Sequence, residues 1–153
     1  MIEIGALNIN GSARSVIPHK SWLGTDMRPG PGVDWVVACE NITEDHHGQY
    51  DGVVCCETLE HCADWHSVVR KLFSLAMPHT GIIVITVPSP GFPRHDYPSD
   101  YWRFTPEDLR RMAGACSVLS EGTWRDSGNS PGCGIVLRNN GVPEFGFKVD
   151  DVK

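Results

Sequence analysis

Residues 2–26 combine an apolar segment, a glycine-bearing turn and an acid, a combination that could hold the ribose of a nucleotide-like cofactor. Residues 2–4 predict a short strand, and the turn after it contains Gly5 and Gly11, where a ligand could approach the backbone closely. Asp26 follows about twenty residues later, at the end of a second predicted strand. Its carboxylate could accept hydrogen bonds from two ribose hydroxyls. The alternative is an ordinary strand, turn and helix beside an exposed acid.

The glycine spacing argues against a dinucleotide. The fingerprint G-x-G-x-x-G is absent, because Leu7 and Ile9 stand where further glycines would be needed. A pyrophosphate cradle is therefore disfavoured. A nicotinamide-dependent oxidoreductase is accordingly a less favoured interpretation.

A second group of reactive side chains lies in the long segment after the apolar run at 81–87. His95 is the best candidate general base there, because its intrinsic pKa lies near neutrality. Asp96, Tyr97 and Asp100 could orient it or bind substrate hydroxyls. The alternative is a loop that only folds over the sheet edge, with Arg103 pairing Asp100 or Asp108. Position favours function, since ligands of open α/β sheets bind at the carboxyl ends of strands.

The cysteines and histidines do not indicate a metal site. Six cysteines contain no C-x-x-C pair, and several fall in apolar runs where buried thiols are expected. Zinc ligation by His61 with Cys55, Cys56 and Cys62 is disfavoured, because neighbours on one strand point to opposite faces. The adjacent His46 and His47 lie in a polar loop and are expected to be solvated.

Length and charge limit the class of protein. A chain of 153 residues fits one domain that buries about two-thirds of its unfolded surface. The net charge of -6 argues against binding to nucleic acid or to an anionic membrane. The sequence contains neither a signal-like start nor a membrane-length apolar run, so a cytoplasmic protein is expected.

The expected elements alternate along the chain. Strands are predicted at 2–4, 22–25, 33–38, 50–56 and 81–87, the last buried on both faces. Helices are predicted at 12–17, at 65–76 with Asp64 as N-cap, and from Thr105, where Pro106 and Asp108 complete a near capping box.

The chain is expected to close with two strands, at 118–124 and 134–138, forming an antiparallel hairpin. The predicted fold class is α/β, with a Rossmann-like sheet that is mostly parallel and ends in this hairpin. Residues 1–138 form the predicted cofactor-binding domain, and 139–153 a loosely ordered tail.

Several motifs in this order resemble class I S-adenosylmethionine-dependent methyltransferases, and most closely the type 11 group. They are the turn at 3–5, Asp26, the aromatic-Asp strand at 50–54, Leu-Glu-His at 59–61 and the Pro-x-x-Gly strand from residue 78. The resemblance covers about residues 1–138. It implies S-adenosyl-L-methionine as cofactor and a transferase that methylates an oxygen or nitrogen atom of a small molecule or glycan.

The resemblance also implies roles for individual residues. Glu3 and Gly5 match the motif that holds the methionine part of the cofactor, and Asp26 matches the acid on the ribose hydroxyls. The implied cofactor-binding set is Glu3, Gly5, Ala6, Gly11, Asp26, Met27, Glu40, Asn41, Cys55 and Glu57. Met27 would lie against the adenine, and Glu40 or Asn41 would replace an absent acid beside it. Cys55, Cys56 and Glu57 would line the floor near the methyl group, and His61 of the Leu-Glu-His motif would pack below the site. His95 and Asp96 are the candidate catalytic residues.

Two departures from the family pattern leave an alternative. The second and third glycines of the first motif are missing, and the sequence starts at the first strand without the helices that commonly precede it. The cofactor site is then a minimal form of the family's site that stays open to solvent, or it is covered by a partner chain or a second copy of this chain. A non-catalytic or partner-dependent scaffold that binds the cofactor is the alternative function.

Overall fold

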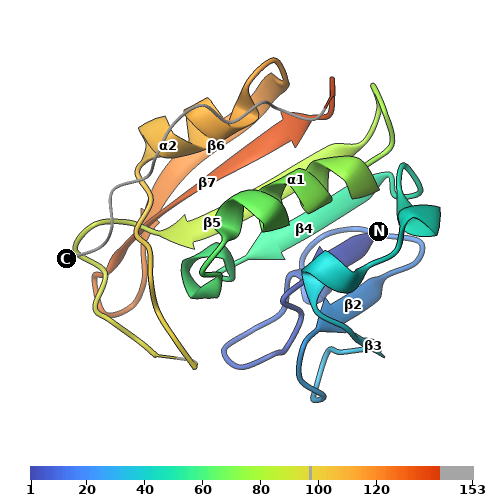
Figure 1. Ribbon diagram of the computed structural model, residues 1–153. Coiled ribbons are helices and arrows are strands. Elements are labelled where there is room, and N and C mark those ends of the chain that lie inside the picture. Colours follow the sequence, from blue (N-terminus) through green and yellow to red (C-terminus); the bar gives the residue numbers. More distant parts are fainter. Residues whose placement is uncertain (97, 142–153) are drawn as a thin grey trace.

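The structure, a computed structural model, is built on one seven-stranded sheet with the order β3-β2-β1-β4-β5-β7-β6. It describes residues 1–96 and 98–141. The strands are β1 Ile2–Ile4, β2 Leu23–Asp26, β3 Trp35–Val36, β4 Gly52–Cys56, β5 Ile82–Pro88, β6 Ser117–Arg125 and β7 Pro131–Arg138. The first five are parallel, whereas β7 runs antiparallel between β5 and β6 (Figure 1). The predicted α/β sheet with a closing hairpin is confirmed.

The two α-helices begin where the sequence predicts. Helix α1, Trp65–Leu75, starts after Asp64, whose side chain accepts a hydrogen bond from the Ser67 amide. Helix α2, Pro106–Ala113, starts with a complete capping box between Thr105 and Asp108. Such side chains satisfy amide groups that the first turn of a helix leaves unpaired.

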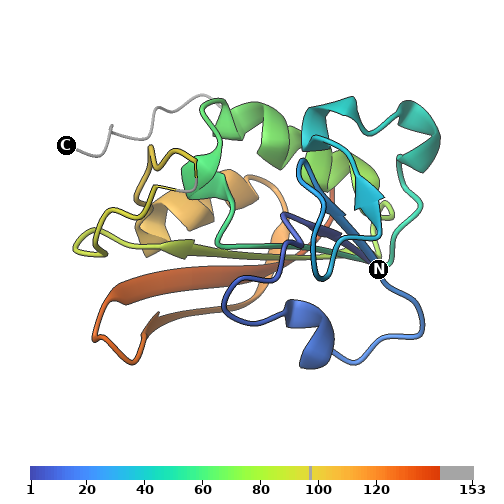
Figure 2. The same ribbon diagram turned by 90° about the horizontal axis from the view of Figure 1, so that it is seen from below.

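Both α-helices lie on the same side of the sheet (Figure 2). The core between them and the sheet is apolar, because alternate strand residues point toward the helices. It contains Ile2 and Ile4 of β1, Ile83 and Ile85 of β5, and Trp65, Leu72, Leu109 and Met112 of the helices, all at most 3% exposed.

The remaining connections are shorter than predicted. The expected helix at 12–17 is a single 3-10 turn, η1 Ala13–Ser15, in which the Ser12 side chain makes no capping bond. β-branched Val16 and Ile17 and then Pro18 follow it, and none of these extends a helix easily. The predicted strand at 33–38 is reduced to the two residues of β3.

Three more 3-10 turns occur among residues 1–96 and 98–141: η2 Cys39–Asn41, η3 Glu44–His46 and η4 Leu59–His61. In Figure 2, η2 and η3 lie on the side of α1, and only η1 lies on the opposite side. That opposite face is therefore thinly covered within the described residues. Strand β6 is exposed along its whole length.

The folded part extends beyond the predicted boundary at residue 138. Asn139 is only 3% exposed, and its Nδ2 donates to the carbonyl oxygens of Ala76 at 2.9 Å and Phe73 at 3.1 Å. The rest of the predicted tail, 142–153, lies outside the described residues. None of the described helices has both the length and the apolar character needed to span a bilayer.

Candidate active site

A cleft of about 1060 Å³ lies over the carboxyl ends of β1, β2 and β4. Its walls come from the turn after β1, the segments after β2 and β4, and the loop after β5. Parallel strands bring these four segments together, because all their carboxyl ends meet at one edge of the sheet. Ten of the twelve predicted catalytic and cofactor-binding residues line the cleft: Glu3, Gly5, Ala6, Gly11, Asp26, Met27, Glu40, Glu57, His95 and Asp96.

The turn after β1 requires glycine at its first position. Gly5 has φ +75°, and a Cβ atom there would collide with Oγ1 of Thr58. The amides of Gly5 and Ala6 both donate to the Thr25 carbonyl oxygen at 2.9 Å. The backbone of this turn is thus fixed between β2 and the segment after β4.

Glu3 is a buried acid beside this turn. It is 5% exposed, and its Oε2 accepts a hydrogen bond from Trp22 Nε1 at 3.0 Å. Burial raises the pKa of Glu3, while the Trp22 hydrogen bond and the Arg14 charge oppose that shift. The carboxyl group therefore has a defined orientation at the cleft wall.

Asp26 closes β2 at the opposite side of the turn. Its Oδ1 accepts a hydrogen bond from the Arg28 amide at 2.9 Å, which orients the carboxylate. The next side chain, Met27, is 65% exposed and offers an apolar surface at the cleft.

Two predicted cofactor residues are placed differently. Cys55 is fully buried in the core and Asn41 does not line the cleft, whereas their neighbours Cys56 and Glu40 do. Successive strand residues point to opposite faces, so only one of the two predicted floor cysteines, Cys56, can face the cleft.

Glu57 stands directly after β4 in a left-handed conformation, with φ +48°. Its amide donates to the Thr86 carbonyl oxygen of β5 at 2.9 Å. Desolvation by the cleft walls, together with the charge of Glu60, raises the pKa of Glu57 to about 7, although the residue still contacts solvent. Its charge therefore changes near neutral pH.

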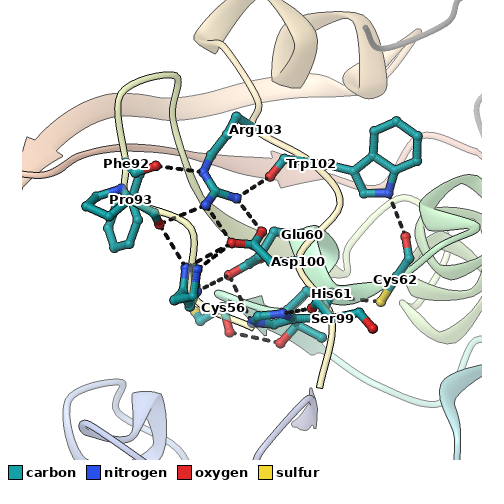
Figure 3. A network of polar contacts seen from close by, with 12 residues as sticks. Cys56, Glu60, His61, Cys62, Phe92, Pro93, Ser99, Asp100, Trp102 and Arg103 are labelled. Atoms are coloured by element: carbon teal, nitrogen blue, oxygen red, sulfur yellow. Dashed lines mark hydrogen bonds and ion pairs between the residues drawn. The ribbon is translucent and has the colours of Figure 1, made fainter. Parts of the chain in front are cut away.

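The loop after β5 is anchored by a buried ion pair between Arg103 and Asp100, with side chains 4% and 1% exposed. Of the two partners predicted for Arg103, Asp100 is the one it contacts, while Asp108 serves the cap of α2. Arg103 also donates to the Pro93 carbonyl oxygen at 2.8 Å and to that of Phe92 at 3.2 Å (Figure 3). Burial alone would raise the pKa of Asp100, but Arg103 and the His95 amide hold it below its usual value.

His95 is held at the cleft by this loop. Its amide donates to Asp100 Oδ2 at 2.8 Å, and its Nδ1 lies 3.3 Å from the same oxygen. Its Nε2 lies 3.7 Å from Oε1 of Glu60, whose carboxylate raises the pKa of His95. Asp96 pairs with Arg94 at 2.9 Å and so does not orient the imidazole. Tyr97 lies outside the described residues.

Sequence analysis predicted no role at the cleft for Glu60 or Thr58, and the family resemblance implied that His61 packs below the site. The structure places His61 at the cleft wall, with its Nδ1 2.5 Å from the Ser99 carbonyl oxygen (Figure 3). The available signal was the Leu-Glu-His motif itself, since it directly follows β4, a strand adjacent to β5.

This seven-stranded order, with a cofactor-sized cleft at the carboxyl ends and an acid at the end of β2, is that of the class I S-adenosylmethionine-dependent methyltransferases. Residues 20–132 match the sequence profile of a family described as a methyltransferase domain. The chain belongs to this family and is an S-adenosylmethionine-dependent methyltransferase.

Solved structures agree with the fold. The N-methyltransferase NodS from Bradyrhizobium japonicum WM9, in complex with S-adenosyl-L-homocysteine, is 14% identical with a TM-score of 0.62, over 90% of this chain and 76% of that one. The CurJ carbon methyltransferase is 16% identical with a TM-score of 0.65, over 92% of this chain and 48% of that one.

A structure of a complex between the Haloferax volcanii Trm112 methyltransferase activator and a methyltransferase is 14% identical with a TM-score of 0.58, over 96% of this chain and 83% of that one. No curated protein sequence gives a match.

Proposed function

We propose that the protein transfers the methyl group of S-adenosylmethionine to an oxygen or nitrogen atom of a small molecule or glycan. The observation that carries the proposal is the position of His95, which faces the same cleft as the turn after β1 and Asp26. The net charge of -6 favours a small or neutral acceptor over a nucleic acid. Six free cysteines suit a reducing compartment, the cytoplasm.

In this proposal the cleft divides into a cofactor side and an acceptor side. Asp26 accepts hydrogen bonds from the ribose hydroxyls, and Met27 and Glu40 lie toward the adenine. The turn after β1 lies toward the methionine part of the cofactor and contributes Glu3, Gly5, Ala6 and Gly11. Cys56 and Glu57 form the floor near the methyl group. The roles of Asn41 and Cys55 pass to their neighbours, because those neighbours face the cleft.

The chemistry on the acceptor side needs alignment and one proton acceptor. The lone pair of the acceptor atom forms a bond to the methyl carbon while the carbon–sulfur bond breaks and its electron pair stays on sulfur. The acceptor's proton passes to Nε2 of His95, since Nδ1 faces the Asp100 carboxylate. Asp96 contributes at the cleft rim, where it could bind an acceptor hydroxyl.

A partner-dependent form is the second candidate. The face opposite α1 carries only η1 among the described residues, and the cleft extends onto that face at Val84 and Thr86. A second copy of the chain or a different protein could complete the cover, as an activator accompanies the Haloferax relative. In that case the isolated chain binds the cofactor and transfers no methyl group until the partner is present.

Transfer of labelled methyl groups to a panel of hydroxylated and aminated small molecules tests the proposal. We expect His95→Ala to slow transfer by about a hundredfold or more, because a positioned base contributes that much, while leaving cofactor affinity unchanged. The wild-type rate should rise with pH through the raised pKa of His95, and the variant should lack that rise. His79→Ala, at the other end of the sheet, is the control. A normal rate and pH profile in His95→Ala would remove His95 as the base.

A further inference from the structure

Three potential metal-ligand atoms converge beside the cleft, from Glu60, His61 and His95. Nε2 of His61 lies 3.6 Å from Oε1 of Glu60, and Nε2 of His95 lies 3.7 Å from the same oxygen. All three atoms lie within 4.8 Å of one another. They come from the segments after two adjacent parallel strands, β4 and β5.

Glu60 has a buried carboxylate that lacks a hydrogen-bond donor. The residue is 0% exposed, and neither Oε1 nor Oε2 has a hydrogen-bond partner in the described part of the chain. Burial of an ionised carboxylate costs several kcal/mol unless a cation or donors compensate it. A positive charge next to the Glu60 carboxylate would therefore stabilise this arrangement.

The other ring nitrogens determine which atoms of the histidines face Glu60. His61 Nδ1 lies 2.5 Å from the Ser99 carbonyl oxygen, which can only accept, so this Nδ1 carries the proton. His95 Nδ1 faces Asp100 Oδ2 and the Pro93 carbonyl oxygen, each at 3.3 Å and both acceptors. In the neutral rings the lone pairs are then on the Nε2 atoms, which lie 3.6 and 3.7 Å from Glu60 Oε1. Histidine ligands of metals are commonly oriented by such partners.

We propose that Glu60, His61 and His95 form a binding site for a divalent transition-metal ion, with zinc as the representative ion. In a tetrahedral site with bonds of about 2.1 Å, two ligand atoms lie about 3.4 Å apart, close to the 3.6 and 3.7 Å observed. Two nitrogens and one carboxylate oxygen leave a fourth position open, as in catalytic zinc sites. His61 and His95 both line the cleft, so that position faces it.

The neighbouring thiols are poorer ligands than these three groups. Cys62 donates its Sγ hydrogen to the Thr58 carbonyl oxygen at 3.3 Å, and Cys55 is closed off in the core. The competing explanation is a proton on His95, which would form an ion pair with Glu60. Protonation would involve the His95 imidazole alone, whereas a metal ion would bind both His61 and His95. Variants of the two histidines can therefore distinguish the two explanations.

Metal binding also deepens the proposed function. An ion at Nε2 of His95 occupies the lone pair that would take the acceptor's proton, so ion and proton compete for one atom. The bound ion would instead offer its open position to an acceptor oxygen and lower that oxygen's pKa. This consequence rests on the proposed function, whereas binding of the ion does not.

Calorimetric titration of untagged, metal-free protein with Zn²⁺ tests the site. We expect one ion per chain, and a loss of at least about tenfold in affinity in Glu60→Gln, His61→Gln and His95→Gln. The control, His46→Gln combined with His47→Gln, should bind as the wild type does. His95 is 38% exposed, so His95→Gln should fold even if Glu60→Gln does not.

Co²⁺ as a spectroscopic substitute identifies the ligand atoms. Visible bands of four-coordinate Co²⁺ without a thiolate charge-transfer band would support the site. No binding, equal affinity in all variants, or a thiolate band would overturn it. These outcomes are independent of methyl transfer, so failure to find an acceptor would leave the result on the metal unaffected.

Discussion

At the scale of single residues, Asp26 has the most clearly defined proposed role. Its carboxylate is oriented by the Arg28 amide and stands at the cleft, away from the packed core. We expect Asp26→Ala to weaken S-adenosylmethionine binding by about a hundredfold, because two hydrogen bonds to a charged acceptor contribute about 3 kcal/mol. The fold should remain intact, and calorimetry with circular dichroism would show both effects.

Asp51→Ala is the matched control for Asp26, because its side chain is 77% exposed and lies before β4, at the opposite edge of the sheet. It should bind the cofactor normally. Unchanged affinity in a folded Asp26→Ala protein would contradict the assignment of Asp26 to the ribose.

The raised pKa of Glu57 predicts that cofactor binding depends on pH. Its pKa of about 7 means that the carboxylate forms as pH rises through neutrality. The sulfonium of S-adenosylmethionine is positively charged, so affinity should increase from pH 6 to pH 8, and less so for S-adenosylhomocysteine. Glu57→Gln should remove that difference between the ligands, as measured by titrations at several pH values. If the two ligands still differ in their pH dependence when bound to Glu57→Gln, a group other than Glu57 causes that difference.

The same shift affects stability with a definite sign. The folded state holds the Glu57 proton up to about pH 7, whereas the unfolded chain releases it near 4.5. Unfolding free energy should therefore fall as pH rises between these values, because the unfolded state binds fewer protons there. Urea titrations of wild type and Glu57→Gln should diverge over this range.

Sequence reasoning identified residues whose role depends on local position. Gly5 and Asp26 were predictable because each stands at a strand end, and both line the cleft. Which of Cys55 and Cys56 faces the cleft was not predictable, since it depends on which face of β4 meets the helices. The meeting of Glu60 with His95 requires the pairing of β4 with β5 and a loop that folds back, and neither is encoded in residue spacing.

At the scale of elements, the loop after β5 is shaped by Arg103. We expect Arg103→Met to cost about 3–5 kcal/mol of unfolding free energy, because it leaves the Asp100 carboxylate buried without its cation. The combined Asp100→Asn and Arg103→Met protein should lose less. Chemical denaturation measures both, and an additive loss in the double variant would argue against a coupled pair.

The control for this loop is Arg110→Met, which breaks the exposed ion pair of α2 with Glu121. Ion pairs of that kind contribute little in solvent, so its denaturation midpoint should stay close to that of the wild type. If Arg110→Met lost as much unfolding free energy as Arg103→Met, burial of the ion pair would not explain the difference in stability that we expect.

The elements that were predicted correctly carry strong local signals. The apolar run of β5 and the caps of α1 and α2 are determined by nearby residues, and all three appear near the expected positions. The connection after β1 was predicted as a helix from residues with weak helical propensity. Without an apolar stripe to bury, it forms only one 3-10 turn.

At the scale of the whole molecule, the described residues pack one face of the sheet and leave the other nearly bare. The helices and the core lie on the first face, while Val118, Leu119 and Trp124 of β6 remain 36–46% exposed. Aromatic and aliphatic side chains on an exposed edge strand are typical of surfaces that bind another chain. Membership of the family shows that the protein uses S-adenosylmethionine. The proposed partner or second copy would bind to the bare face.

The most direct test of the account is calorimetric titration of the purified protein with S-adenosylmethionine and S-adenosylhomocysteine, with NAD as a control. The cleft predicts saturable binding of the first two at one site per chain, and no binding of NAD, because Leu7 and Ile9 replace the glycines of a pyrophosphate cradle. Binding of NAD, or of none of the three ligands, would contradict an intact methyltransferase cofactor site in this chain.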